Sequence, residues 1–168
     1  MRILGIDPGT AITGYGVIET DGRRLSLVSA GAIRLRGVPE EGGRLRQAAE
    51  SLAAVIAEHI PDEASLERVF HHANVRSALV LSQMRGAILL ELARAGLPVH
   101  EYTALQVKKA LVGYGRAQKE QVRQMTQRLL APALVPPPHD LSDALALAIC
   151  HAHTSAGQRR YPCVPARR

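Results

Sequence analysis

The chain has 168 residues, 46% of them hydrophobic, and carries 21 basic against 15 acidic side chains, a formal net charge of +6. That length is typical of one domain, and it suffices to bury a core without disulfides or a structural metal. The longest apolar run, Ala144 to Cys150, is far too short for a membrane span, and two cysteines are too few for a disulfide framework or a zinc site. The N-terminus lacks the pattern of a signal peptide, so we expect a soluble, cytoplasmic protein.

The first part of the chain predicts three strands joined as an antiparallel meander. Residues 2–7 form a short apolar run that ends at the turn signal Pro8-Gly9. A second strand is expected over 14–19 and a third over 24–35, with Asp21-Gly22 as the hairpin turn between them. The three strands are therefore neighbours in one sheet.

From residue 42 onwards, helical and strand patterns alternate. Helical periodicity is expected over 44–59, after Gly42-Gly43, and over 76–95, with short strands at 65–70 and 97–102. Three more helices follow near 103–112, 118–131 and 140–153. Such an order predicts an α/β fold: a five-stranded mixed sheet, antiparallel and then parallel, with helices on both faces. We expect one domain over 1–155 and a basic, disordered tail over 156–168.

Four carboxylates stand out because their surroundings are apolar. Asp7 closes a strand, Glu67 lies inside one, and Asp140 and Asp143 open a helix that is otherwise apolar. Residues three apart share one face of a helix, so Asp140 and Asp143 can point at one spot.

Each of the four has an ordinary structural alternative: a turn, a helix cap, or a solvent-facing strand position. Considered together, they favour convergence, because strand ends and a helix start meet at one rim of an α/β sheet. Four converging carboxylates require a cation. Ligation by oxygen alone suits Mg²⁺ or Mn²⁺, and a pair of such ions is the arrangement used to hydrolyse phosphodiesters.

The excess positive charge lies entirely in residues 101–168, which hold ten basic and four acidic side chains. Within this range, six basic side chains accompany a single acid between positions 108 and 128: Lys108, Lys109, Arg116, Lys119, Arg123 and Arg128. Clustered cations favour a polyanionic partner such as nucleic acid. The alternative is a solvated basic face with no specific partner.

Several motifs, in order along the chain, resemble the RuvC family of Holliday-junction resolvases, which have a ribonuclease H-like fold. They are Gly5-Ile6-Asp7-Pro8-Gly9-Thr10, Leu66-Glu67-Arg68-Val69-Phe70, Gln106-Val107-Lys108, Val112-Gly113-Tyr114-Gly115, Lys119-Glu120-Gln121-Val122 and Asp140-Leu141-Ser142-Asp143. The resemblance covers roughly residues 1–153.

The resemblance implies a homodimer that binds four-way DNA junctions and nicks two opposed strands. It implies that Asp7, Glu67, Asp140 and Asp143 are catalytic carboxylates that bind Mg²⁺ or Mn²⁺, two ions per site. A branch-migration motor of the RuvA and RuvB type is the implied protein partner.

The resemblance also implies roles for side chains that meet the DNA. Lys119 corresponds to a catalytic lysine near the scissile phosphate, Lys108 to a second lysine that contacts DNA, and Phe70 to an aromatic that meets unpaired bases. Together with Lys109, Arg116 and Arg123 of the basic run, these residues are the predicted DNA contacts. No role is assigned to His71, His72 or His139.

Two alternatives remain open at the level of sequence. The Gly5–Thr10 segment also resembles the phosphate loop of actin-like and sugar-kinase-like nucleotide-binding domains, although those proteins require two such domains around a cleft. A nuclease-like domain that binds junctions without cutting them is the other alternative.

Overall fold

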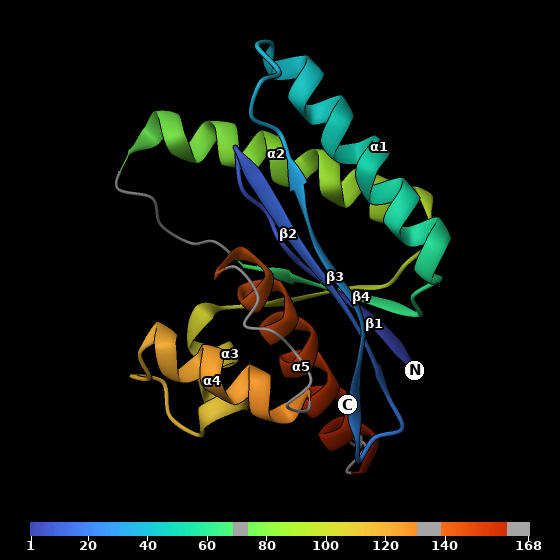
Figure 1. Cartoon of the computed structure of the whole chain (residues 1–168), viewed down its shortest axis with the longest axis vertical. Helices are drawn as coiled ribbons and strands as arrows, with labels where there is room; N and C mark the ends of the chain where they lie inside the picture. Colours follow the sequence, from blue (N-terminus) through green and yellow to red (C-terminus); the bar gives the residue numbers. More distant parts are fainter. Residues whose placement is uncertain (69–73, 131–138, 161–168) are drawn as a thin grey trace, which may run out of the picture.

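A five-stranded sheet forms the centre of the molecule (Figure 1). The computed structural model describes residues 1–68, 74–130 and 139–160, with the side chains of 139–140 and 156–160 left out. The strands are β1 (Arg2–Asp7), β2 (Ile12–Thr20), β3 (Leu25–Arg34), β4 (Glu63–Glu67) and β5 (Val99–Tyr102), and their order across the sheet is β3-β2-β1-β4-β5.

Strand directions confirm the predicted mixed sheet. β1, β2 and β3 pair antiparallel as a meander, whereas β1 pairs with β4 and β4 with β5 in parallel. A meander needs only tight turns, but parallel neighbours need a crossover, and the chain supplies a helical segment for each one.

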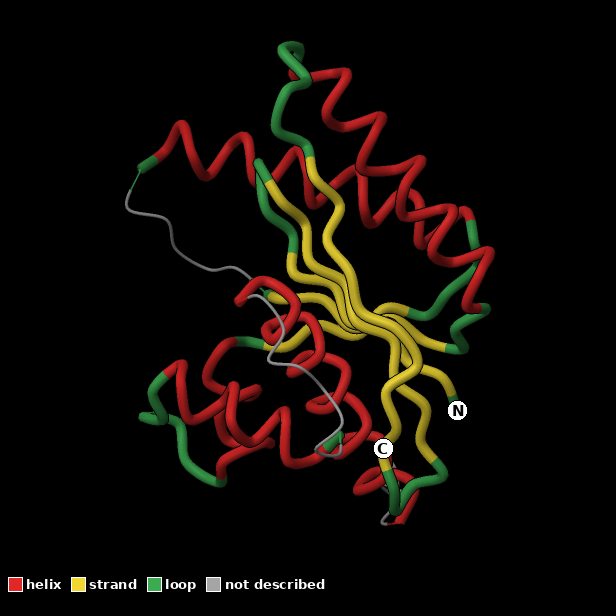
Figure 2. Tube along the Cα trace, in the orientation of Figure 1, coloured by secondary structure: helices red, strands yellow, loops and turns green. Residues whose placement is uncertain are grey.

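Helices cover both faces of the sheet in two groups, as the tube in Figure 2 shows. The helices are α1 (Glu41–His59), α2 (Val75–Arg94), α3 (Ala104–Val112), α4 (Lys119–Leu129) and α5 (His139–Arg160). α1 and α2 bury Leu52 and Ile88 against Leu4 and Ile6 of β1. α3, α4 and α5 enclose the other core, which includes Ile3 of β1. Alternate residues of β1 therefore serve opposite layers.

Predicted bounds differ most from the structure at β4 and at the last helix. β4 runs over Glu63–Glu67 rather than 65–70, and its pairing with β5 closes where the Arg68 backbone N–H donates to the Tyr102 carbonyl (2.8 Å). The last helix continues to Arg160, beyond the expected end at 153 and into the segment expected to be disordered. No proline occurs between 139 and 160, so the backbone has no obligatory stop there.

α5 lies unusually close to the sheet because two strand residues facing it are glycines. A Cβ at Gly5 would lie 2.0 Å from the Ala144 carbonyl oxygen, and one at Gly16 would lie 2.5 Å from the Leu145 side chain. Residues 144–150 of the helix are all buried. The glycines thus fix the position of the beginning of α5 over β1 and β2. No helix in the described ranges is long and apolar enough to cross a membrane.

Candidate active site

Asp7 and Glu67 lie side by side at the ends of two parallel strands. In the β1–β4 register, Gly5 pairs with Ser65 and Ile6 with Leu66, so the next position on each strand carries a carboxylate. Side chains alternate along a strand, and Asp7 and Glu67 therefore point to the face that α5 covers. Both residues are partly buried.

α5 brings a third carboxylate to the same rim. Asp143 lies near the beginning of this helix, one residue before the Ala144 carbonyl that approaches Gly5, and its side chain is 32% exposed. Asp140 lies one turn earlier on the helix backbone, and its side chain is outside the described residues. Three of the four carboxylates singled out in the sequence are thus brought together by the fold.

A pocket of about 330 Å³ opens between these residues. Its polar lining consists of Asp7, Glu67 and Asp143 together with Lys108 and Lys119, and its apolar wall comes from α3, α4 and α5. The arrangement places carboxylate oxygens and two ammonium groups around one space. It can hold a hard cation through the oxygens and an anionic substrate through the lysines.

Lys119 makes a direct ion pair with Asp143, with 2.6 Å between Nζ and Oδ2. The lysine is the first residue of α4, and a capping box between Gln118 and Gln121 fixes where that helix begins. An ammonium group held against Asp143 shows that this carboxylate attracts a cation in the folded chain. The carboxylate oxygens fit the divalent metal predicted from the sequence, and a metal ion there would share Asp143 with the Lys119 ammonium.

Behind Glu67, an arginine from the opposite layer anchors the end of β4. Nη1 of Arg85, on α2, donates to the Glu67 carbonyl oxygen (2.5 Å), and its Nη2 pairs with Glu101 of β5. Arg68 approaches the other Glu101 oxygen at 3.4 Å. Sequence reasoning missed Arg85, because a single arginine on an amphipathic helix carries no signal of what it contacts.

The remaining predicted DNA contacts are Lys109, Arg116, Arg123 and Phe70, and three histidines near the predicted site have no assigned role. Lys109 and Arg116 are exposed, as a surface contact requires. Arg123 makes two hydrogen bonds to Glu120, of 2.6 and 2.8 Å, and these raise the pKa of its guanidinium. Phe70, His71 and His72 lie outside the described residues, and His139 begins α5 with its side chain likewise outside them. No role of these residues is tested by the geometry.

The family model described as crossover junction endodeoxyribonuclease RuvC matches residues 3–151 of this sequence. The chain belongs to the RuvC family. The match spans the pocket and both layers of the fold, so it removes the alternative of an actin-like or sugar-kinase-like nucleotide-binding domain.

Relatives in the RuvC family are similar over nearly their whole length. The crossover junction endodeoxyribonuclease RuvC of Heliobacterium modesticaldum is 53% identical over 92% of this chain and 95% of its own. That of Geobacter metallireducens is also 53% identical, over 95% of this chain and 96% of its own.

Solved RuvC structures have the same fold. RuvC of Thermus thermophilus superposes with a TM-score of 0.85 at 30% identity, covering 92% of this chain and 95% of that one. The same protein in complex with a Holliday junction substrate gives a TM-score of 0.88, covering 94% and 96%. The yeast mitochondrial Holliday junction resolvase shares the fold at 11% identity, with a TM-score of 0.69.

Proposed function

We propose that this protein is a crossover junction endodeoxyribonuclease that resolves four-way DNA junctions in recombination and repair, by nicking two opposed strands at the carboxylate pocket. The observation that carries the proposal is the pocket itself. In a chain of the RuvC family, it gathers Asp7, Glu67 and Asp143 with two lysines.

Asp7, Glu67, Asp140 and Asp143 would hold one or two Mg²⁺ or Mn²⁺ ions. A divalent ion bound there would activate water and neutralise charge on the scissile phosphodiester. Asp7 and Glu67 sit on a hydrogen-bonded sheet and Asp143 on a helix fixed by glycine contacts, so the three carboxylates are positioned before substrate arrives. Such preorganisation is what a metal-dependent nuclease requires of its protein.

The lysines supply the positive charge that meets the phosphate. Lys119 is 64% exposed and Lys108 lines the same pocket, so both ammonium groups can reach a backbone phosphate at its mouth. A cation at that place stabilises charge that develops on the phosphoryl oxygens during in-line attack. Lys119 therefore acts on the reacting phosphate, and Lys108 holds the strand.

Two symmetric cuts need two pockets. We propose that a homodimer provides them. One face of α2 presents three exposed apolar side chains, Val75, Leu79 and Leu90, which lie within about 60° of one another around the helix axis. A second copy packed on this face would bury them. Sedimentation velocity of Leu79→Glu should show a monomer, whereas Leu105→Glu, at an exposed position on α3, should leave the dimer intact.

A branch-migration motor of the RuvA and RuvB type is the proposed protein partner, and the cytoplasm is the proposed location. The junction and the motor would then be found in the same compartment as the chromosome.

The deciding experiment compares an immobile four-way junction with a linear duplex of the same arm sequence, in Mg²⁺, Mn²⁺ or EDTA. We expect paired nicks on opposed strands of the junction alone, and no cleavage in EDTA. Asp7→Asn should bind the junction as tightly as the parent and leave it uncut.

Two outcomes would contradict the proposal. Equal cleavage of the linear duplex would remove junction selectivity. Tight junction binding without cleavage, across a set of junctions with varied core sequences, would favour the alternative of a nuclease-like domain that binds junctions without cutting them.

A further inference from the structure

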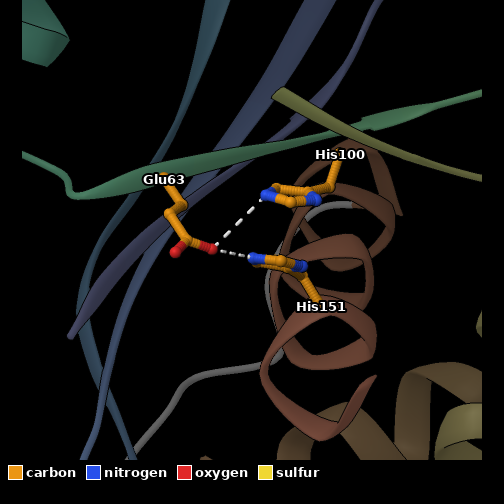
Figure 3. A group of neighbouring side chains, drawn as sticks. All are labelled: Glu63, His100 and His151. Atoms are coloured by element: carbon orange, nitrogen blue, oxygen red, sulfur yellow. Dashed lines mark hydrogen bonds and ion pairs between the residues drawn. The ribbon is translucent and has the colours of Figure 1, made fainter. Parts of the chain in front are cut away.

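A second cluster of metal-ligating side chains lies at the other end of β4, away from Glu67. Glu63 begins β4, His100 lies on β5, and His151 lies on α5 (Figure 3). The His151 Nε2 is 2.5 Å and the His100 Nε2 is 3.5 Å from the same Glu63 oxygen, Oε2. The two imidazole rings are stacked, with their centroids 4.2 Å apart.

These three side chains have the spacing and access that an ion needs. One ligand atom from each lies within 4.8 Å of the other two. The side chain of His151 is 2% exposed, that of Glu63 22% and that of His100 43%. The cluster is therefore closed on the α5 side and open beside His100, which gives an ion a rigid seat and a path of entry.

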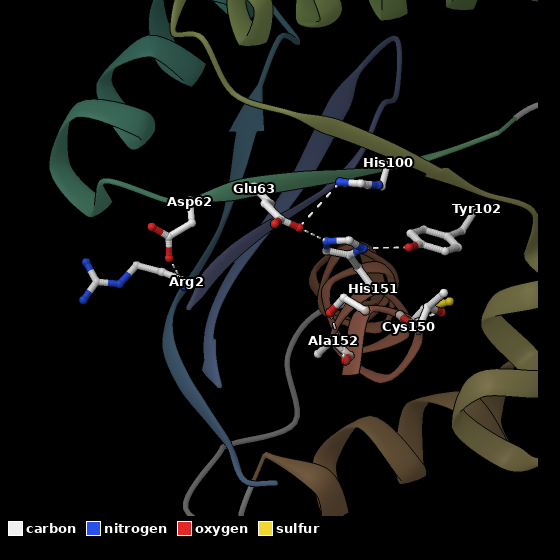
Figure 4. A network of polar contacts seen from close by, with 10 residues as sticks. Arg2, Asp62, Glu63, His100, Tyr102, Cys150, His151 and Ala152 are labelled. Atoms are coloured by element: carbon white, nitrogen blue, oxygen red, sulfur yellow. Dashed lines mark hydrogen bonds and ion pairs between the residues drawn. The ribbon is translucent and has the colours of Figure 1, made fainter. Parts of the chain in front are cut away.

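A tyrosine contacts the ring nitrogen of His151 that faces away from the cluster. The Tyr102 hydroxyl lies 2.6 Å from Nδ1 of His151, on the side of the ring away from Glu63 (Figure 4). A carboxylate only accepts, so the Nε2–H of His151 donates to Glu63, while the Tyr102 hydroxyl can donate to Nδ1 or accept from it. An ion that replaced the Nε2 proton would leave Nδ1–H to donate to the phenol oxygen. Metal-binding histidines typically donate their second ring N–H to a carboxylate, a backbone carbonyl or water, and the Tyr102 oxygen would accept it here.

The buried hydroxyl of Ser65, beside the cluster, also supports a bound ligand. Ser65 follows Glu63 on the same face of β4 and pairs with His100 in the register with β5. Its residue is fully buried, and its Oγ finds no hydrogen-bond partner among the described residues. Buried hydroxyls almost always have a hydrogen-bond partner, so a ligand bound at the neighbouring cluster would supply the contact that the Ser65 Oγ lacks.

We propose that Glu63, His100 and His151 form a second metal site, for Zn²⁺ or a similar first-row transition ion, with Tyr102 as the supporting hydrogen-bond partner. Two imidazoles and one carboxylate are a typical protein ligand set for Zn²⁺, with water in the fourth position. Mg²⁺ prefers oxygen ligands alone, so it would be a poor occupant here and a good one among the catalytic carboxylates.

An ion at this site would join three elements. The ligands come from β4, β5 and α5, so the ion would tie the sheet to the helix that carries Asp143. His151 lies eight residues beyond Asp143, about 12 Å along the helix axis, and the catalytic pocket includes none of the three ligands. The ion would therefore act on the stability of the fold rather than on the substrate in the catalytic pocket.

The test uses the full chain without an affinity tag, stripped of metal, in the Asp7→Asn background that weakens the catalytic site. Equilibrium dialysis should show one Zn²⁺ per chain that a large excess of Mg²⁺ does not displace. Co²⁺ should give the visible absorption of a four-coordinate ion, and Zn²⁺ should displace it. Zn²⁺ at 100-fold its dissociation constant should raise the melting temperature by about 5–10 °C.

His100→Ala should weaken Zn²⁺ binding by about 100-fold or more and remove the Co²⁺ band, since it deletes a ligand. Tyr102→Phe should weaken Zn²⁺ binding by about 10-fold, since it removes the supporting contact. His153→Ala is the matched control, because His153 is an exposed histidine on the same helix outside the cluster, and it should bind Zn²⁺ as the parent does.

The proposal fails if the parent gives no Co²⁺ band and no Zn²⁺-dependent rise in melting temperature. It also fails if His100→Ala, checked for folding by circular dichroism, retains the parent's Zn²⁺ affinity. Because all readouts are made in Asp7→Asn without DNA, they are independent of whether the chain resolves junctions.

Discussion

At the scale of single residues, the Lys119–Asp143 pair gives the sharpest prediction about chemistry. Lys119→Met should lower the single-turnover rate of junction cleavage by about 100-fold, the typical effect of removing one group that stabilises transition-state charge. Junction affinity should change little, because one of many phosphate contacts is lost. The measurement is cleavage with enzyme in excess, beside a gel-shift titration.

Lys109→Met is the matched control for that prediction. Lys109 carries the same charge and belongs to the same basic run, but it does not line the pocket. A similar loss of rate in both variants would show that general positive charge, rather than the position of Lys119, supports cleavage.

The candidate catalytic carboxylates could be recognised in the sequence because each one interrupts an apolar pattern. Asp7 does so at the end of β1, and Asp143 does so at the beginning of α5. The Glu63–His100–His151 cluster could not be recognised. Its members come from three elements far apart in the chain: the pairing of β4 with β5 brings Glu63 near His100, and the packing of α5 adds His151. Periodicity reveals which face a residue occupies, not which distant residue it meets.

At the scale of elements, Arg85 holds the end of β4 in place from behind and so positions Glu67 without touching the substrate. Arg85→Met should raise the Mg²⁺ concentration needed for half-maximal cleavage by about 10-fold, because the Glu67 backbone would lose its anchor. Saturating Mg²⁺ should restore much of the rate, and Arg85→Lys should restore part of it at low Mg²⁺.

Arg94→Met provides the comparison for Arg85. Arg94 lies on the same helix but is 67% exposed, and its pairing with Glu91 stays within α2. An unchanged Mg²⁺ dependence in Arg85→Met would exclude the positioning role, and a shift of equal size in Arg94→Met would assign the effect to general charge.

Close packing of α5 on β1 gives a prediction about stability. Gly5→Ala should destabilise the protein by about 3 kcal/mol, because the new methyl group would meet the backbone of Ala144, which cannot rotate away. Gly86→Ala, in α2 with open space around it, should instead stabilise by about 0.5–1 kcal/mol. Urea unfolding measures both; a neutral Gly5→Ala would show that the contact is not tight.

Most elements follow from local pattern, and the two ends of β4 show where local pattern stops being sufficient. The acidic start of β4 looks like a loop, yet Glu63 pairs with Ile3 and belongs to the strand. Val69 and Phe70 favour strand structure by residue type, but β4 ends at Glu67. Neighbouring strands, rather than strand propensity, decide those ends.

At the scale of the whole molecule, the six basic side chains between positions 108 and 128 belong to α3, α4 and the loop that joins them, in the layer that encloses the pocket. α1 lies across the sheet in the other layer (Figure 1). Junction affinity should therefore fall steeply with salt, and the slope should depend on which layer loses charge. Replacing Lys108 and Arg116 together by glutamine should reduce the slope of log affinity against log salt by about 1.8, since each lost phosphate contact contributes about 0.9.

Replacing Arg44 and Arg46 of α1 by glutamine removes the same amount of charge from the other layer. This control should leave the slope unchanged, because counterion release depends on contacts with phosphate rather than on net charge. The slopes are measured by fluorescence anisotropy across a salt series. If the Lys108 and Arg116 double variant has the same slope as the Arg44 and Arg46 double variant, DNA does not lie along the α3–α4 side. The DNA would then pass the pocket along a different surface.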